Sequence, residues 1–394
     1  MLSGLVSYDV FAPLARRPTR TRFGAELREA WLGFYKERVD LRVGNQRVAW
    51  GHGDAFPVND VVNAREIRDP VLIETELRHV PTFLLRADAA LGAGSLQVVV
   101  APFFRPDRYD VYGTNWSFLQ TGAPPGYRGF LTALTQPGGL PPEDAGRLLF
   151  PDRGAPSDDL SGLEGGLRLE WTRGRLTVSH YYHYGVHGTP DFAMDAGLGQ
   201  ALDATDWSAV SADDVRDLAA RIGASPAVRS EWPRRHHLGL GLTTTAGALA
   251  LRLDTAYEHE GLFYDQRFHG WRSPVVQAVA AVELSSADPG RALLVEVWQQ
   301  WLQRTPSPGL LYANRATTAL ALLARRTWRE RVELEMRAVV GASPASYVLR
   351  PQVAWKKDAF ALRLGLVLPG GEERSYGDWF GRNRSAYLML KRSF

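Results

Sequence analysis

The sequence contains no cysteine in 394 residues. Cytosolic proteins of this size usually carry a few cysteines, so their absence favours an oxidising compartment such as the periplasm or the outer membrane. Chance in a sequence rich in Arg and Ala is the alternative explanation.

Long apolar runs are also absent. The longest are only a few residues, such as residues 98–104, whereas a membrane-spanning helix needs about 20 apolar residues. If the chain crosses a membrane, it must do so as a closed barrel, because an open sheet would leave backbone groups without hydrogen-bond partners in lipid.

Charge of one sign does not dominate. The chain has 46 basic and 43 acidic residues, a formal net charge of +3, and no run of five like charges. This excludes an acidic tail or a basic nucleic-acid-binding arm, and we expect no nucleic-acid partner. The first residues show no basic region followed by an apolar core, so we expect no signal peptide in this numbering. An outer-membrane protein requires one, so this numbering then starts at a mature or recombinant residue, or at a misplaced gene start.

Aromatic residues, in contrast, are plentiful, with 12 Trp, 14 Tyr and 16 Phe. Trp and Tyr favour membrane–water interfaces, where one end of the ring is apolar and the other is hydrated.

Apolar and polar residues alternate through most of the chain, which places successive side chains on opposite faces of a strand. In residues 330–341, Val332, Leu334 and Met336 share one parity, and Glu333 and Glu335 share the other. In residues 22–36, the predicted apolar face comprises Phe23, Ala25, Leu27, Trp31, Gly33 and Tyr35.

Segments of this kind, separated by turn residues, predict an all-β fold: a transmembrane, antiparallel, up-and-down β-barrel of about sixteen strands, with fourteen as the alternative. The whole chain, residues 1–394, forms one barrel domain. The expected strands are residues 3–11, 22–36, 38–50, 80–91, 94–105, 163–172, 174–184, 233–244, 247–259, 273–286, 291–303, 311–324, 328–341, 345–356, 358–368 and 383–394.

The polar faces carry charges of both signs, which favours a hydrated lumen over the dry core of a soluble β-sandwich or soluble barrel, the alternative folds. The apolar faces then meet lipid in a bacterial outer membrane. Side chains expected to line the lumen and contact solute are Glu26, Asp40, Arg42, Gln46, Trp50, Arg86, Asp88, Arg168, Glu170, Arg252, Asp254, Arg331, Glu333, Glu335, Arg337, Arg350 and Arg363.

The last residue, Phe394, closes an alternating segment. A terminal aromatic in this position resembles the signal by which outer-membrane barrels are recognised by the barrel-assembly machinery. An ordinary last strand that ends in Phe is the alternative.

Three segments interrupt the alternation: residues 51–77, 119–163 and 187–231. In the first, Asn59 or Asp60 is expected to cap a short helix running toward Arg68. In the third, Ser211 is expected to cap a helix that includes Ile222. Long loops of barrels are extracellular or fold into the lumen. We expect residues 51–77, called the plug loop below, to fold inward.

The motif Gly-x-Gln-x-Val-x-Trp-Gly, from Gly44 to Gly51, is followed by a loop from Asn59 to Arg68 and an aromatic segment at residues 101–104. This block, about residues 40–105, resembles a family of outer-membrane barrels catalogued as a domain of unknown function. More distantly it is similar to alginate-export and porin-type barrels. The family pattern Asn-Pro-x-Asp is replaced here by Asn63-Ala-Arg-Glu. The resemblance implies a role beside envelope exporters of hydrophobic or lipid-like molecules.

The residues of this block also indicate a docking loop. Gly44 leaves room for the loop between Arg42 and Gln46. Polar side chains of the loop are then free to bond to lumen charges and pin it as a plug, with or without a role in gating. The expected plug residues are His52, Asp54, Asn59, Asp60, Asn63 and Arg65.

Catalytic motifs are not evident. His180 and His183 fall on opposite faces of a strand, so they do not converge on a metal ion. Ser179 and His183 share a face but lie too far apart along a strand for a nucleophile–base pair. We therefore expect no enzyme activity, no metal and no cofactor.

The expected function is an outer-membrane channel, or the outer-membrane component of an exporter, that passes a small, amphipathic or lipid-like solute. Lumen charges of the two signs are nearly equal, so strong ion selectivity is not expected. The alternative is a plugged barrel that anchors an envelope complex, and a lipid hydrolase is the third reading. Expected partners are outer-membrane lipid, the barrel-assembly machinery, and an inner-membrane exporter or periplasmic protein.

Overall fold

The structure is a computed structural model that describes residues 2–8, 23–68, 78–109, 116, 160–194, 217, 220, 228–265, 270–285, 288, 290–306, 309–310, 313–373 and 375–392. Its main element is a single sixteen-stranded sheet. The strands are β1 (Leu2–Tyr8), β2 (Phe23–Lys36), β3 (Val39–Gln46), β6 (Thr82–Leu91), β7 (Gly94–Ala101), β8 (Glu164–Arg173), β9 (Leu176–Val186), β12 (Arg234–Ala246), β13 (Leu249–Tyr264), β14 (Gly270–Ser285), β15 (Arg291–Leu302), β16 (Ala316–Trp328), β17 (Val332–Ala342), β18 (Ala345–Lys357), β19 (Phe360–Gly371) and β20 (Ser385–Arg392).

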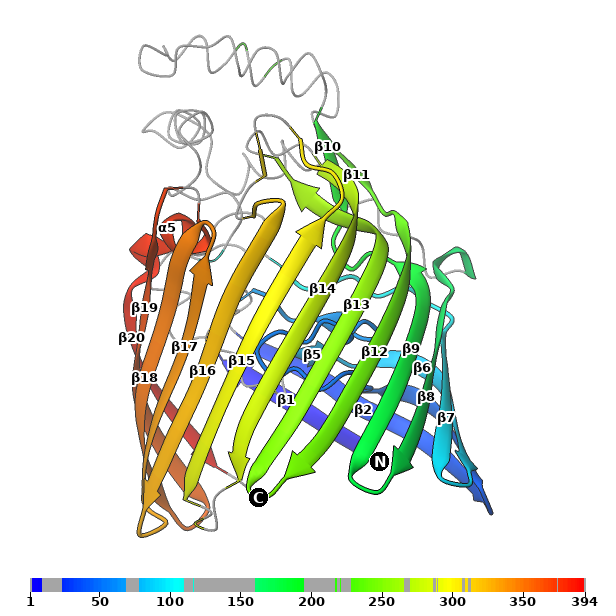
Figure 1. The fold of residues 1–394 in the computed structure, drawn as a ribbon, viewed down its shortest axis with the longest axis horizontal. Coiled ribbons are helices and arrows are strands. Elements are labelled where there is room, and N and C mark those ends of the chain that lie inside the picture. The colour runs from blue at the N-terminus through cyan, green and yellow to red at the C-terminus, as the bar shows by residue number, and fades with distance from the viewer. Residues whose placement is uncertain are drawn as a thin grey trace.

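The strands pair in chain order, each antiparallel to the next, which is up-and-down topology. Figure 1 shows the sheet curving round, with β12–β18 in front and β1 and β2 behind. Within the described residues, β1 and β20 are the two ends of the order and form no ladder with each other. The predicted all-β fold, an antiparallel up-and-down sheet of sixteen strands, is confirmed. In the described part of the chain, no helix is long and apolar enough to cross a membrane.

The connections differ between the two ends of the sheet. Tight turns of two or three residues join β2 to β3, β6 to β7, β8 to β9, β12 to β13, β16 to β17 and β18 to β19. They lie at the lower edge of Figure 1, and most of the longer connections lie at the upper edge, where the two-residue turn between β17 and β18 is an exception. Gly92 and Gly174 have positive φ angles of 65° and 60°, which glycine adopts without steric cost. Short turns at one end and long loops at the other are typical of outer-membrane barrels.

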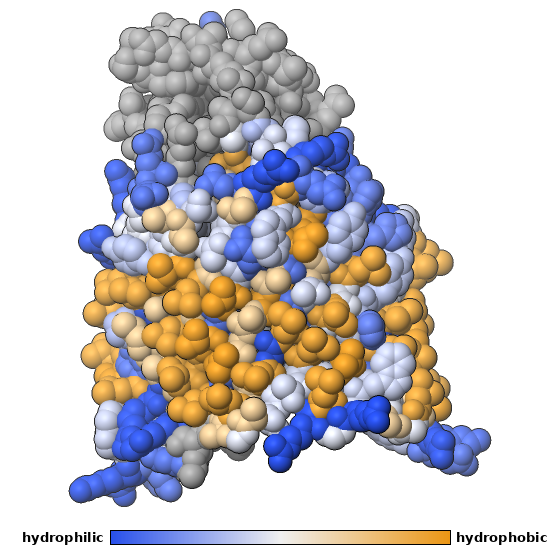
Figure 2. Space-filling model, viewed as in Figure 1, coloured by the Kyte–Doolittle hydropathy of each residue, from blue (hydrophilic) through white to orange (hydrophobic). Residues whose placement is uncertain are grey.

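Alternation sorts the side chains of β17 as predicted. Leu334 and Val340 are 45% and 43% exposed on the outer face, whereas Glu333 and Glu335 are each 5% exposed on the inner face. Figure 2 shows the result over the visible side of the molecule: an apolar belt across the middle, with hydrophilic residues above and below it. Such a belt suits the hydrocarbon layer of a bilayer.

The predicted apolar face of β2 is wrong from Trp31 onward. The register of β1 against β2 shifts between Leu2 and Gly4, which inserts one extra residue into β2. A bulge of this kind reverses the alternation that follows it. Leu32 and Phe34 therefore form the exposed outer face, at 71% and 63%.

The predicted short helix between Asn59 and Arg68 is also wrong. This stretch contains turns and a two-residue strand, β4 (Ala64–Arg65), which pairs with β5 (His79–Val80). A further ladder joins β10 (Asp191–Met194) to β11 (Val228–Glu231) within the predicted loop 187–231. Of the predicted helix at 211–222 only Asp217 and Ala220 are described, and both are helical. Residues 119–159 lie outside the described residues.

After β19, a short connection contains η3 (Gly381–Asn383) and one turn of helix, α5 (Tyr376–Trp379), capped by the Ser375 hydroxyl, which accepts from the Asp378 backbone N–H at 3.0 Å. Another single turn, η2 (Leu160–Gly162), leads into β8.

Candidate functional site: the lumen and its plug loop

The described part of the plug loop, residues 51–68, lies against inward-facing residues of β12, β13 and β15. On β13, Asp254 is 1% exposed. Its carboxylate accepts the backbone N–H groups of His52 and Gly53 at 2.5 and 3.0 Å, and its other oxygen contacts His52 Nδ1 at 3.0 Å. Arg252 donates to the carbonyl of His52 at 3.1 Å and to Asp54 at 2.8 Å.

On β15, Glu296 is completely buried and makes the second anchor. Its two carboxylate oxygens accept the backbone N–H groups of Asp54, Ala55 and Phe56 at 2.6, 2.7 and 3.3 Å. The Phe56 ring stacks on Trp298, with centroids 5.5 Å apart and planes at 14°. A buried carboxylate needs such partners, because an unpaired buried charge is strongly unfavourable. These two carboxylates therefore fix the tip of the plug loop by its backbone.

Trp50, where the chain leaves β3 for the plug loop, is 2% exposed. Its indole N–H donates to Gln97 of β7 at 2.7 Å, and its ring packs against Tyr181 and His183 of β9 at 5.8 and 6.3 Å. A Cβ on Gly166 would meet the Trp50 ring at 2.7 Å, so this position of β8 requires glycine. The start of the plug loop is held by packing as well as by hydrogen bonds.

The middle of the plug loop is held by amides. Asn59 is fully buried, and its Oδ1 lies 3.2 Å from Nε2 of His237 on β12. A Cβ on Gly239 would lie 2.1 Å from that same oxygen, so glycine is needed for this close approach. Asn63 spans the base of the loop, accepting from Val48 N–H at 2.6 Å and donating to the Gln46 carbonyl at 3.0 Å. Asp60 pairs with the imidazole of His79.

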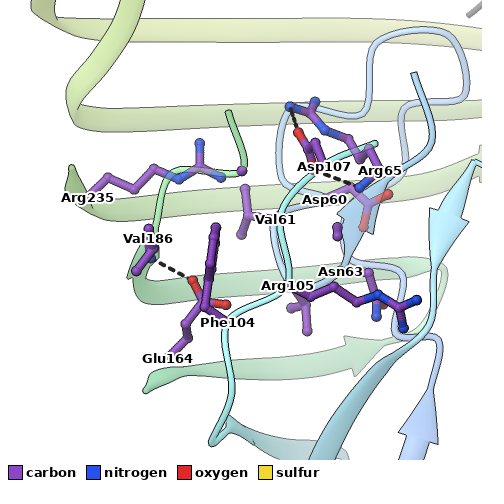
Figure 3. Close-up of a pocket in the computed structure, with 13 residues that line it drawn as sticks. Asp60, Val61, Asn63, Arg65, Phe104, Arg105, Asp107, Glu164, Val186 and Arg235 are labelled. Carbon is purple, nitrogen blue, oxygen red and sulfur yellow. Dashed lines mark hydrogen bonds and ion pairs between the residues drawn. The ribbon is translucent and has the colours of Figure 1, made fainter. Parts of the chain in front are cut away.

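A small cavity opens where the plug loop meets the connections after β7 and β9, as Figure 3 shows. Asp107 accepts from the Arg65 backbone at 2.7 Å and from its guanidinium at 3.3 Å. Glu164 accepts from Val186 N–H at 2.6 Å. Other lining residues include Asp60, Asn63, Phe104, Arg105 and Arg235.

Beside this cavity, charges are paired in a buried cluster. Arg235 donates to Glu258 at 2.9 Å, and His187 Nε2 lies 3.7 Å from the same carboxylate. Burial, reinforced by Arg235, lowers the pKa of His187 to about 4. His187 is therefore neutral at pH 7.

The inner faces of β3, β6, β17 and β18 carry ion pairs that do not involve the plug loop. On β6, Arg86 Nε donates to Asp88 at 2.6 Å. On β17 and β18 the pairs are Arg337–Glu335 at 2.5 Å and Lys356–Glu333 at 2.7 Å. Arg42 of β3 pairs with Asp40 at 4.0 Å and lies 4.8 Å over the Trp31 ring, and Arg350 donates to the Tyr387 hydroxyl at 3.0 Å.

The family described as "Protein of unknown function (DUF1302)" matches residues 16–358 of this chain. The chain belongs to the DUF1302 family. The resemblance to an outer-membrane barrel family of unknown function is thus confirmed. No curated protein matches the chain.

Solved structures similar to this DUF1302 chain include outer-membrane proteins. The siderophore receptor PirA of Pseudomonas aeruginosa aligns over 81% of this chain and 50% of its own, at 8% identity and a TM-score of 0.38. The DUF1302 chain thus spans half the length of that receptor. OccAB1 of Acinetobacter baumannii aligns over 94% and 76% of the two chains, at 7% identity and a TM-score of 0.44. OprB of Pseudomonas putida aligns over 90% and 83%, at 8% and 0.38.

Most of the predicted lumen residues of the DUF1302 chain lie on strands at inward positions. Arg168 and Glu170 share the inner face of β8, where Glu170 accepts from the Ser179 hydroxyl at 3.1 Å. Arg363 lies on β19 between the outward Leu362 and Leu364, which are 41% and 53% exposed. Gln46 is 2% exposed and donates to the Leu84 carbonyl at 2.9 Å.

Arg331 was placed in the lumen wrongly. It precedes β17, is exposed, and lies in the turn whose preceding residues Arg329 and Glu330 have φ angles of 47° and 59°. The prediction applied strand alternation to a turn residue, and in a turn successive side chains do not point to alternate faces. Glu26 lies in β2, but its side chain and Phe394 are outside the described residues.

Sequence reasoning missed three residues of the wall that hold the plug loop or Trp50 at its start, namely Glu296, His237 and Gln97. One signal was available for Glu296, which is a lone carboxylate between Val295 and Val297 and has the inward parity of β15. Gln97 is likewise a lone polar residue between Leu96 and Val98 of β7.

Proposed function

We propose that this DUF1302 protein is a channel of the Gram-negative outer membrane, or the outer-membrane component of an exporter, whose lumen is narrowed by the plug loop. One observation carries the proposal. The apolar face of the sheet is exposed outward, while charged residues on the inner face bind a loop that folds between them. This arrangement suits a hydrated conduit with a built-in constriction.

The way the plug loop is held supports a movable constriction. Its tip contacts the wall largely through five backbone N–H groups that donate to Asp254 and Glu296. Water can replace polar contacts of this kind when a loop detaches, because water offers the same donors and acceptors. Water cannot replace an apolar contact in this way.

A sealed barrel that anchors an envelope complex is the second candidate. The observation that favours it is the deep burial of Trp50 and Asn59, which are 2% and 0% exposed and hold the start and middle of the plug loop. In either role we expect no catalysis, an annulus of outer-membrane lipid, and assembly through β20 by the barrel-assembly machinery. An inner-membrane exporter or periplasmic protein would deliver the solute, which is small, amphipathic or lipid-like.

Planar-bilayer conductance separates the two candidates. We expect replacement of residues 52–68 by a short Gly-Ser linker to raise the single-channel conductance several-fold over that of the intact chain. Strand content by circular dichroism and heat-dependent gel mobility serve as controls for folding. A folded variant whose trace stays closed would favour the sealed anchor and end the channel proposal.

A further inference from the structure

The acids of the inner face are unequally available to a solute. Asp254 and Glu296 are 1% and 0% exposed, and their oxygens are occupied by the backbone of the plug loop. These two carboxylates therefore hold the plug loop and are not available to bind a solute. The charge that a solute meets in the lumen therefore depends on which acidic and basic side chains are exposed on the other strands.

On β17 and β18, each ion pair buries its acid and presents its base. The Glu335 side chain is 3% exposed and that of its partner Arg337 is 34% exposed. The Glu333 side chain is 6% exposed and that of its partner Lys356 is 39% exposed. The acids lie against the wall, and the cationic ends of both pairs reach into the lumen.

Other cations gather at the same place. Arg363 has the inward parity of the next strand and is partly exposed, whereas Arg350, opposite Arg337 in the β17–β18 register, is only 6% exposed.

The exposed acids lie elsewhere. Asp54 and Glu283, 52% and 39% exposed, flank Arg252 on the side held by the plug loop. On β3 and β6, the side chains of Asp40 and Asp88 are more exposed than those of their basic partners, at 42% against 26% and 24% against 19%. Within the described residues, accessible positive charge therefore gathers on β17–β19, and the exposed, inward-facing Arg325 of β16 adjoins it.

We propose that the inner face of β17–β19 is an anion-preferring track for solutes that carry a carboxylate or phosphate group. Guanidinium and ammonium groups are the donors that recognise such oxygens. A near-equal count of acids and bases predicts weak selectivity, but the exposure of each group reverses that expectation. The inference rests on the proposed channel function and adds the charge class of the solute.

The test uses a conducting parent in which residues 52–68 are replaced by a Gly-Ser linker and which carries Asp254→Asn and Glu296→Gln. The two amides prevent plug removal from uncovering fresh acids. The chloride-to-potassium permeability ratio is obtained from the reversal potential across a KCl gradient. We expect a ratio several-fold above one, falling to about one when Lys356→Gln and Arg363→Gln are added. The matched control is Lys357→Gln, an exposed residue of opposite parity to Lys356, which leaves the ratio unchanged.

The outcomes separate the two claims. A folded parent that carries no current overturns the channel function and with it the track. A parent that conducts with a ratio of one or less overturns the track alone, as does a ratio that the Lys356 and Arg363 substitutions leave unchanged. Replacing chloride by acetate or by inorganic phosphate then ranks carboxylate against phosphate solutes.

Discussion

Replacing Val340 by Arg is expected to lower the free energy of unfolding of the barrel by about 2–4 kcal/mol, the cost of placing this side chain on the lipid face near the bilayer centre. Val340 is 43% exposed and lies in an outward row with Leu320 and Val297. The neighbouring residue Val339, 36% exposed, has the opposite parity and faces the lumen. Val339→Arg should therefore cost less than about 1 kcal/mol, because water and lumen carboxylates solvate the guanidinium there.

The pair is closely matched, since the two substitutions introduce the same side chain one residue apart on one strand. The measurement is guanidinium-induced unfolding of each variant in lipid vesicles, extrapolated to zero denaturant. Equal costs at Val339 and Val340, or a larger cost at Val339, would contradict the assignment of faces.

Removing both carboxylate anchors, with Asp254→Ala and Glu296→Ala, is expected to release the tip of the plug loop. Five backbone N–H groups lose charged acceptors, and a hydrogen bond to a charged group contributes about 1.5–3 kcal/mol. Even after water replaces part of this, the loss amounts to several kcal/mol. Single-channel conductance should rise above that of the intact chain, toward that of the variant in which residues 52–68 are replaced.

Glu283→Ala provides the control for this experiment. Glu283 pairs with Arg252, and within the described residues its carboxylate accepts no hydrogen bond from the plug-loop backbone. This variant should keep the conductance of the intact chain. If the double variant matched Glu283→Ala, the two anchors would not be what holds the plug loop in place.

The fold was readable from the sequence because each strand has one apolar and one polar face. On β17, the alternation of Val332, Glu333 and Leu334 determines which side chain meets lipid, and no distant residue is needed to decide it. The prediction failed where the backbone departs from strict alternation. In β2 one extra residue reversed the faces at Leu32 and Phe34, and at Arg331 a turn had already ended the strand.

The site was only partly readable. The polar residues of the plug loop were recognised as an inward-docking set, and their partners Asp254 and Arg252 were expected in the lumen, but Glu296 and His237 were not predicted. Glu296 lies 242 residues along the chain from Asp54, and a pairing over this distance cannot be predicted from the local sequence. Asn59 and Asn63 have the residue type of helix caps. Here their amides bond instead to His237 and to the backbone at the base of the loop, so no helix follows.

Cysteine scanning of β17 tests the central claim most directly, and the absence of native cysteine allows single labels to be placed cleanly. Spin labels at residues 333–340 would be compared in vesicles for accessibility to oxygen, which concentrates in lipid, and to a water-soluble nickel complex. The account predicts a period of two, with nickel favoured at 333, 335, 337 and 339 and oxygen favoured at 334, 336, 338 and 340. The opposite phase, or no alternation, would contradict a barrel with an apolar exterior and a charged lumen.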